Sequence, residues 1–561
     1  MVKTRRSGRT RRTGRSATSR RSRRTGRTGW SLSRWRSALS VLFALIVLSA
    51  LIAPSALSQT RDWSPKDRTI LGDFTRINAV ASSIDRVYAA APTALLIYDP
   101  QFKQWHGPFT PRDPGTLDRV FAGLADPLDN SLWLARPDGW VHYTPELDLW
   151  ERGIAPNTVQ EIAFDADQPA LGLLLRTQGG WFNVPRGGVS AVPINPPRRL
   201  IRPATSNDAI RSNPALQANS SAILLNGRMR TARYTSAAKA LGLPGWYLGT
   251  TGVGLLFLPE GAAMPERLSF GLPGEDVGAL FPAPGGVWII TQRTSNQDAA
   301  VSFVSNELTQ FRWIEGPRAT GFPFNKAYRL VGNQKDLWAA TDVGLMRLNP
   351  ESEEMDLYDE GAGLPNRTVT DLAVRRGRIA IATLNGVVSL GDSLKIQPVA
   401  PSFTDAALAV AFEGDTIWVG TEAGLAVALP GQGNLMQPIG LKQSPAFQAP
   451  VVDIEWAADT LVALTTERML WRDTRSDTWT LGPILSTQVG RLHTFVRYHA
   501  GFFVAGERGF GYAALNTQIV RPILTPGDLP GPVTSIAVDE GYLWVGTRRG
   551  LVRFSLDAIG P

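Results

Sequence analysis

The stretch that decides the fold reads YLWVGTRRGLVRF and runs from Tyr542 to Phe554. Three other stretches share its order of residues: GWYLGTTGVGLLFL from Gly245, DLWAATDVGLMRL from Asp336 and TIWVGTEAGLAVAL from Thr416. Each has an aromatic residue between apolar ones, then a small residue and threonine, a few variable residues, and a glycine before a second apolar run. This recurrence predicts a repeated structural unit.

The repeat covers most of the chain, because the position of its aromatic residue returns about every 42 residues. One interval, from Leu174 to Tyr247, is longer by about thirty residues. It contains a stretch rich in proline and asparagine, and we expect an insertion at about residues 190–225. The anchor positions of the repeat are Tyr88, Trp133, Leu174, Tyr247, Trp288, Trp338, Ala380, Trp418, Val462, Phe503 and Trp544.

The order of β-rich runs and turns within one repeat predicts a propeller blade. Each period holds four short β-rich runs separated by turns, which is typical of a four-stranded antiparallel sheet. The second run is apolar on both sides of the pleat, so its sheet must be covered on both faces. Sheets that cover one another around an axis are the blades of a β-propeller. We therefore predict an all-β protein with tryptophan filling the space between blades and glycine at positive φ in the short turns.

About eleven blades exceed the usual four to eight of one ring, so we expect two tandem or interleaved rings. An even division gives blades 1–5 in residues 59–318 and blades 6–11 in residues 319–561. The last blade lacks its fourth strand, because only SLDAIGP follows Phe554. The stretch TRDWSPKDRTILGDF, which starts at Thr60, could supply it. Such closure places the first and last blades in one ring, either a single large ring or one that is interrupted by another.

The N-terminal segment predicts export. Residues 1–36 hold fourteen Lys or Arg and no acidic residue, and we expect this leader to be disordered. Residues 37–58 are apolar with small residues at their end, which predicts a signal peptide cut after Ser58 or, as the alternative, an uncleaved transmembrane anchor. The rest of the chain has a net charge of −5, so no nucleic-acid partner is expected. The expected location is periplasmic or extracellular, with membrane contact only through an uncleaved N-terminal segment.

Catalytic signatures are missing from the sequence. Cysteine is absent, which excludes disulfides and thiolate ligands. None of the four histidines stands at metal-ligand spacing, and His493 and His499 are expected to have structural roles. There is no phosphate-binding loop and no nucleophile elbow. We therefore predict no catalytic residue, no metal and no cofactor, and a protein that is not an enzyme.

The repeat resembles that of the two-component regulator propeller family. The stretch DLWAATDVGLMRLNPESEEMDLYDEGAGLPNRTVTDLAV, from Asp336 to Val374, follows the family pattern of leucine, tryptophan, Gly-Leu and, before the next blade, Gly-Leu-Pro. The match is strongest at Trp338, Trp418 and Trp544. The resemblance implies an extracytoplasmic sensor propeller, although we expect no kinase domain after the repeats of this chain.

The variable positions of the Thr-x-x-Gly turns are the candidate recognition surface, because propeller loops converge on one face. We expect a binding or sensor-like protein that recognises a small extracytoplasmic ligand or another envelope protein there. Two alternatives remain open: an envelope scaffold or accessory protein of a surface or secretion assembly, and a propeller enzyme of the lyase or hydrolase type. The candidate ligand-binding residues are Asp342, Asn385, Glu422, Glu467, Glu507, Arg508, Arg548 and Arg549.

Overall fold

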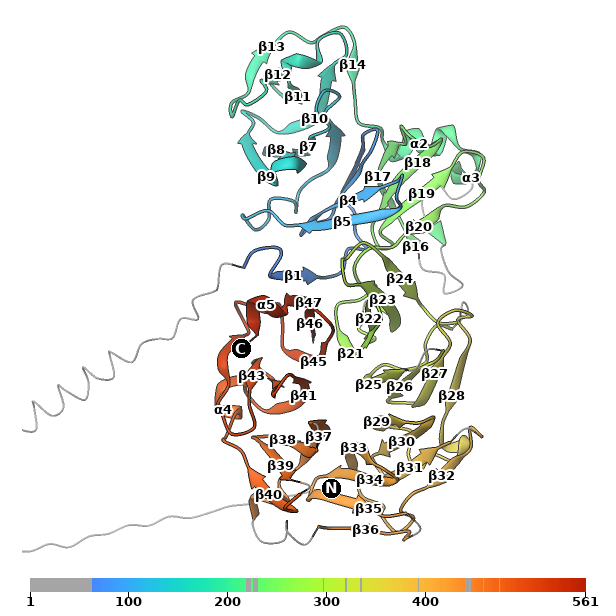
Figure 1. Cartoon of the computed structure of the whole chain (residues 1–561). Helices are drawn as coiled ribbons and strands as arrows, with labels where there is room; N and C mark the ends of the chain where they lie inside the picture. The colour runs from blue at the N-terminus through green and yellow to red at the C-terminus, as the bar shows by residue number, and fades with distance from the viewer. Residues whose placement is uncertain are drawn as a thin grey trace, which may run out of the picture. The chain divides into compact units, whose positions relative to one another are not determined.

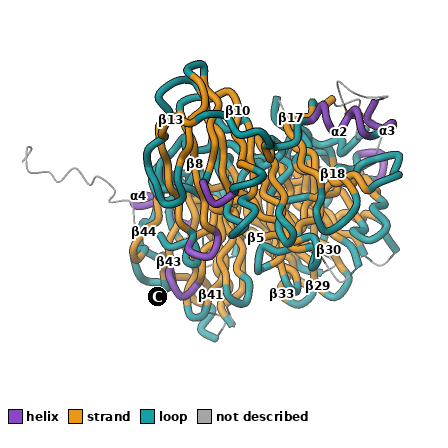
Figure 2. Tube along the Cα trace, turned by 90° about the horizontal axis from the view of Figure 1, so that it is seen from above, coloured by secondary structure: helices purple, strands orange, loops and turns teal. Residues whose placement is uncertain are grey.

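The computed structural model describes residues 63–217, 223–224, 231–295, 297–317, 320–332, 335–391, 393–430, 432–438, 441, 445–457, 459–473 and 475–560. The leader at 1–36 and the signal or anchor segment at 37–58 lie outside these residues. Strands make up about half of the described chain, and the helices are short (Figure 2). The all-β prediction is confirmed. The α-helices are α2 (Ser206–Ser212), α3 (Pro214–Gln217), α4 (Ser486–Val489) and α5 (Leu556–Ile559).

Seven four-stranded antiparallel sheets of the described chain form a ring (Figure 1). From the inner to the outer strand, the sheets consist of β21 (Val277–Ala283), β22 (Gly286–Thr291), β23 (Ala300–Ser305), β24 (Phe311–Ile314); β25 (Ala327–Gly332), β26 (Leu337–Thr341), β27 (Gly344–Leu348), β28 (Met355–Tyr358); β29 (Val369–Arg375), β30 (Arg378–Thr383), β31 (Gly386–Leu390), β32 (Ile396–Pro398); β33 (Ala407–Glu413), β34 (Thr416–Thr421), β35 (Gly424–Ala428), β36 (Leu435–Met436); β37 (Val451–Ala457), β38 (Thr460–Thr465), β39 (Met469–Asp473), β40 (Thr478–Leu481); β41 (Leu492–Tyr498), β42 (Gly501–Gly506), β43 (Gly509–Ala513), β44 (Val520–Leu524); and β45 (Val533–Val538), β46 (Tyr542–Thr547), β47 (Gly550–Ser555), β1 (Arg68–Leu71).

Contacts between the inner strands close this ring. They run in the order β21, β25, β29, β33, β37, β41 and β45, and β45 contacts β21 again. The last sheet takes its outer strand from the other end of the described chain, since β1 pairs antiparallel with β47 from Arg68 opposite Phe554 to Leu71 opposite Leu551. The predicted contribution of the stretch after Thr60 to the last blade is confirmed. One ring is thus interrupted by the residues between β1 and β21.

Those intervening residues form four further sheets. The first strands of these sheets contact one another in the order β17, β2, β6 and β10. Strand β14, from the predicted insertion, pairs with the edge of β10 and makes that sheet five-stranded. The strands are β2 (Ala79–Ser82), β3 (Val87–Ala90), β4 (Leu95–Asp99), β5 (Gln104–Phe109); β6 (Ala122–Ala125), β7 (Leu132–Arg136), β8 (Gly139–Thr144), β9 (Leu149–Ile154); β10 (Val159–Asp165), β11 (Leu173–Thr177), β12 (Gly180–Val184), β13 (Val192–Ile194), β14 (Leu200–Ile201); β17 (Tyr234–Lys239), β18 (Gly245–Thr250), β19 (Leu255–Pro259), β20 (Glu266–Leu268); and a separate pair, β15 (Ile223–Leu224) and β16 (Thr231–Ala232).

The contacts group the sheets differently from the even division at residues 318 and 319. Sheet β21–β24 ends at Ile314, yet its inner strand contacts both β25 and β45. The predicted boundary therefore falls inside the seven-sheet ring. The insertion predicted at about 190–225 contains β13, β14, α2, α3 and β15. The reason for the difference is physical: repeats of equal length carry no mark of which sheets bury their faces against each other.

The recurring aromatic, threonine and glycine residues of the repeat have structural roles in this chain. The aromatic anchors are buried, with Trp133 2%, Trp338 5%, Trp418 4% and Trp544 0% exposed. In six turns of the described chain, the threonine hydroxyl donates a hydrogen bond to the carbonyl three residues on and accepts one from the backbone N–H two residues on, as Thr547 does with Gly550 and Arg549. Gly550 has φ +115°, and a Cβ atom there would lie 2.5 Å from the carbonyl oxygen of Leu71. A side chain at this turn would push β1 away from the ring.

Each inner strand of the ring begins at the edge where the second strand ends, because the two are antiparallel. We call this edge the loop face. It carries the turns at residues 341–344, 383–386, 421–424, 465–469, 506–509 and 547–550.

Candidate binding site in the channel of the ring

The seven inner strands share a β-bulge close to the loop face. In each, the pairing with the second strand shifts register between the first and third residues, so that one residue is left without a partner. A bulge bends the strand and changes the direction of the side chains beside it. The third residue, which follows the bulge, is Ala279, Arg329, Asp371, Ala409, Asp453, Thr494 or Ser535.

Among these residues that follow the bulges, Arg329 bridges the carboxylates of Asp371 and Asp453. Its Nε lies 3.3 Å from Oδ1 of Asp371, and its Nη1 lies 3.6 Å from Oδ1 of Asp453. Strand β33, which lies between the strands of the two acids, has only Ala409 at the same position, and this small residue leaves room for the arginine side chain. The carboxylates are buried, with 8% and 4% of their side chains exposed, whereas 31% of the Arg329 side chain is accessible. The guanidinium therefore offsets part of the negative charge of the two buried acids and still reaches the channel.

Both carboxylates also hold the next inner strand. Oδ2 of Asp371 accepts a hydrogen bond of 2.8 Å from the backbone N–H of Val410. Oδ2 of Asp453 accepts one of 3.2 Å from the N–H of Phe495 and one of 2.8 Å from the hydroxyl of Thr494. Val410 and Phe495 occupy equivalent places after the bulges of their strands. Two equivalent links thus tie neighbouring sheets together at the channel wall.

Burial shifts the pKa values of several groups here. It raises the pKa of Asp371, and the charge of Arg329 opposes part of that rise. The carboxylate of Asp453 raises the pKa of Arg329, with burial acting in the other direction. Burial also lowers the pKa of His493. Deeper along β37, burial raises the pKa of Glu455 to about 7, with the nearby Asp453 adding to the rise.

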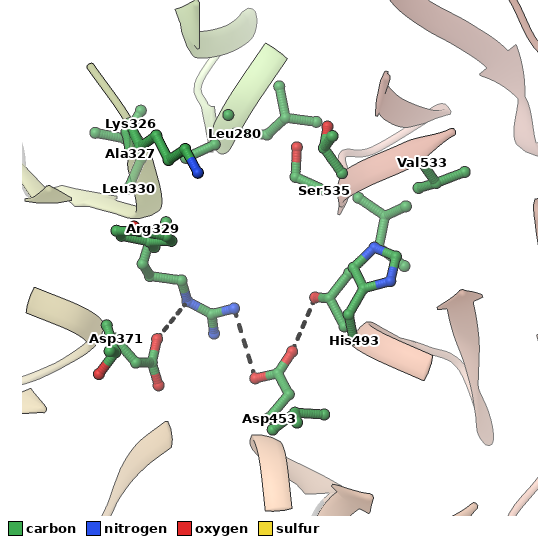
Figure 3. A pocket seen from close by; sticks show the side chains of 18 of the residues that line it. Leu280, Lys326, Ala327, Arg329, Leu330, Asp371, Asp453, His493, Val533 and Ser535 are labelled. Carbon is green, nitrogen blue, oxygen red and sulfur yellow. Dashed lines mark hydrogen bonds and ion pairs between the residues drawn. The ribbon is translucent and has the colours of Figure 1, made fainter. Parts of the chain in front are cut away.

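Arg329, Asp371, Asp453 and His493 line a cavity of about 610 Å³ that opens at the loop face. Figure 3 shows Arg329 between Asp371 and Asp453, with Lys326 and His493 facing the same open space from other sides. Lys326 precedes β25, and Arg491 precedes β41. A cavity of this size suits a ligand, and its walls present charges of both signs from several blades. The arrangement can bind charged and hydrogen-bonding groups.

The structure brings two of the eight predicted residues to this cavity. Glu507 and Arg548 follow the second strands β42 and β46 and line its mouth. Three others support the backbone: Asp342 accepts hydrogen bonds from the N–H groups of Asn325 and Lys326, Asn385 donates to the carbonyl of Pro365, and Arg508 donates to the carbonyl of Thr487. The remaining three, which are exposed and lie outside the cavity, are Glu422, Glu467 and Arg549. Ligand binding by any of the eight stays a prediction.

Sequence reasoning missed the residues of the inner strands. In the sequence, each of the charged residues Arg329, Asp371 and Asp453 is a single polar residue within an apolar run. What they share is the position after the bulge, which the structure shows. His493, for which a structural role is expected, lines the cavity, and its role stays a prediction. Within the described ranges, no group of three or more His, Asp or Glu side chains is placed to hold a metal ion. In the same part of the chain, no helix has the length and apolar character that a bilayer span requires.

A pH-dependent contribution to stability follows from Glu455. Because the folded state raises its pKa from 4.5 to about 7, the folded protein holds this proton more tightly than the unfolded chain does. The stabilising contribution is full below pH 4.5 and is lost as the pH rises through about 7. We expect Glu455→Gln to raise the free energy of unfolding at pH 8 by about 1–2 kcal/mol, after allowance for water in the channel, and to leave it nearly unchanged at pH 4.5.

Thermal unfolding of the full chain and the variant at both pH values measures this difference. Glutamine still accepts the hydrogen bond that the N–H of Arg497 donates to Glu455 at 2.8 Å, so packing is preserved. Glu422→Gln, at an exposed turn, is the matched control and should change neither value. A gain that is equal at both pH values would show that Glu455 is not the titrating group.

Comparisons with known proteins give weak matches of structure. No protein-family model matches this sequence, and no curated protein sequence does. The extracellular domain of the hybrid two-component system BT4673 from B. thetaiotaomicron matches with 12% identity and a TM-score of 0.40, over 86% of this chain and 70% of that chain. PorZ, a surface component of the type-IX secretion system of Porphyromonas gingivalis, matches with 11% identity and a TM-score of 0.42, over 85% and 68%. Virginiamycin B lyase from Staphylococcus aureus matches with 14% identity and a TM-score of 0.40, over 50% and 95%. At these values the likeness supports no assignment of function, and the family resemblance stays a prediction.

Proposed function

We propose that this chain is an exported, non-enzymatic β-propeller protein that binds a ligand or a protein partner at the loop face of its seven-sheet ring. The observation that carries this proposal is the cavity of about 610 Å³ into which charged groups from several inner strands converge. Rigid strands hold these groups. The ion pairs of Arg329 with Asp371 and Asp453 fix their positions before any ligand binds. Such preorganised charges favour recognition, because little ordering is left to the binding step.

The export part of the proposal rests on the sequence of residues 1–58 alone. The non-enzymatic part rests on the chemistry of the cavity. Its two central carboxylates are already engaged by backbone N–H groups, by a threonine hydroxyl and by Arg329, so they are arranged to hold charge in place. A sensor and a scaffold would both use such a surface, and identification of the partner distinguishes them.

The test compares two lysine reversals on opposite faces of the ring. Lys326 is exposed and its ammonium faces the cavity (Figure 3), whereas Lys395 is exposed in the turn between β31 and β32 at the other edge. We expect Lys326→Glu to weaken binding of a ligand captured by the full chain roughly tenfold, since the reversal replaces an attractive charge by a repulsive one. Lys395→Glu should bind as the natural protein does.

Ligands are captured from envelope extracts and from a panel of amino acids, sugars and peptides, and affinity is measured by calorimetry. Mass spectrometry of the recovered ligand should find it chemically unchanged. Equal binding by Lys326→Glu and the natural protein would place the binding surface elsewhere. A ligand that is converted during incubation would contradict the non-enzymatic assignment.

A further inference from the structure

A second cavity adjoins the channel cavity. It has a volume of about 560 Å³ and is lined in part by Asp73, Glu275, Arg267 and Glu315. Asp276 and Arg548 line both cavities. The two spaces therefore meet at these two residues. Each volume alone falls in the range that suits a small ligand, so together they suit a longer one.

The ridge between the cavities is fixed by backbone contacts. The N–H of Gly550 donates a hydrogen bond of 2.7 Å to the carbonyl of Glu275, and the N–H of Arg548 donates one of 3.1 Å to the carbonyl of Pro532. The turn that carries Arg548 is thereby held against the segment that carries Glu275 and Asp276. The side chains of Glu275 and Arg548 are exposed on this ridge. A bound chain that crosses the ridge would meet both charges.

The two cavities differ in charge. The channel cavity is balanced, since four acidic and four basic residues line it, while in the second cavity Asp73, Glu275, Asp276 and Glu315 face only Arg267 and Arg548. Part of this charge is internally satisfied, because Arg267 pairs with Glu315 at 3.1 Å. Glu275 and Asp276 thus give the second cavity an acidic surplus. This surplus favours a positively charged group of the ligand there.

The one aromatic residue among the described residues that line the second cavity, Trp313, argues against a sugar. Sugars bind through free aromatic faces, but the guanidinium of Arg267 lies over the ring of Trp313 at 5.4 Å from its centroid. The indole N–H of Trp313 donates to the carbonyl of Gly271, which fixes the ring in this position. The acidic surplus equally disfavours a phosphate-rich ligand. Charges of both signs along two adjoining cavities match the side chains of a polypeptide.

We infer that the two cavities form one elongated site for an extended peptide segment, which crosses the ridge of Asp276 and Arg548 and places a basic side chain in the second cavity. The inference rests on the proposed function and specifies its ligand. Acidic groups of the same segment face Lys326 and Arg491 in the channel cavity. The partner is thus a peptide with charges of both signs. The separate placement of its basic and acidic groups fixes the direction in which the peptide chain binds.

The test uses a phage library of random dodecapeptides as the probe and a glycan array in parallel, both with the full chain. We expect selected peptides to be enriched in lysine or arginine, and Glu275→Lys to weaken their binding about tenfold, as measured by fluorescence anisotropy. Glu275→Lys should in turn select peptides with an acidic residue in place of the basic one. Glu540→Lys, in the exposed turn between β45 and β46 and outside both cavities, is the matched control and should leave affinity and selection unchanged.

Four outcomes overturn the inference. Selected peptides without a basic residue contradict the charge argument, and binding that is indifferent to Glu275→Lys excludes the second cavity. Binding of a glycan that is lost in Lys326→Glu, with no peptide selected, refutes the peptide but leaves the proposed function standing. Peptides that bind Lys326→Glu and Glu275→Lys as tightly as they bind the natural protein would refute both proposals. Thermal unfolding of every variant checks that a loss of binding does not come from a loss of folding.

Discussion

Replacing Arg329 by leucine is expected to lower the free energy of unfolding of the full chain by about 2–3 kcal/mol at pH 8. The substitution leaves the carboxylates of Asp371 and Asp453 buried without their counter-ion, and a broken buried pair is strongly destabilising. The lower end of the range reflects the 31% exposure of the Arg329 side chain, because water in the channel screens part of the charge. Denaturant unfolding monitored by tryptophan fluorescence measures the change.

The effect should shrink on acidification, since Asp371 already has a raised pKa and its protonated form needs no partner. The double variant Arg329→Leu with Asp371→Asn should recover part of the stability at pH 8. Arg112→Leu, at an exposed position of the inserted sheets, is the control for the loss of an arginine and should have little effect. A loss of stability in Arg329→Leu that is the same at pH 5 and pH 8 would point to packing instead of charge.

Leu71→Ala is expected to destabilise the protein by about 3 kcal/mol, because Leu71 is fully buried in the strand that completes the last sheet. Weakening β1 removes the outer strand from β47, so the effect should reach beyond the mutated strand. Hydrogen exchange measured by mass spectrometry should show loss of protection in β47 and β46. Lys66→Ala, an exposed residue just before β1, is the matched control.

The two readouts separate closure of the ring from local packing. If Leu71→Ala changed exchange only within residues 68–71 and left the unfolding temperature unaltered, β1 would be a dispensable cover. Faster exchange in β21, on the other side of the closing contact, would show that the last sheet holds the ring together. The close approach of Gly550 to Leu71 predicts the same pattern of exchange for a side chain at residue 550.

The repeat predicted the architecture of each sheet because its signals are local. Tryptophan marks the buried face, threonine and glycine build one turn, and these act within a few residues of Trp544 or Trp338. The pairing of β1 was also open to prediction, since a sheet that lacks a strand must find one elsewhere. The grouping of the sheets was not, because the closing contact of β21 with β45 depends on tertiary packing that equal repeats do not record.

The candidate site escaped sequence analysis for a related reason. The turn residues were chosen as variable positions on a common face, and the structure places Glu507 and Arg548 at the cavity. The central charges, however, stand in apolar strands, where Asp371 in VTDLAV reads as an ordinary interruption. Arg329 meets Asp453 across strand β33, which has alanine at the equivalent position. Alignment of the seven inner strands on their bulges would have exposed this column of residues.

The pairing of β1 with β47 also sets an order of events during synthesis. A chain that leaves the ribosome or crosses a membrane from its N-terminus delivers β1 first and its partner last, with the whole of the inserted sheets made in between. The four inserted sheets are stabilised mostly by contacts between residues close in sequence, so they can fold early. The ring, in contrast, cannot close until residue 555 has been made. A polypeptide that is stalled or cut before β47 would have an open ring. The unpaired edge strand of its last sheet would then be accessible to chaperones and proteases.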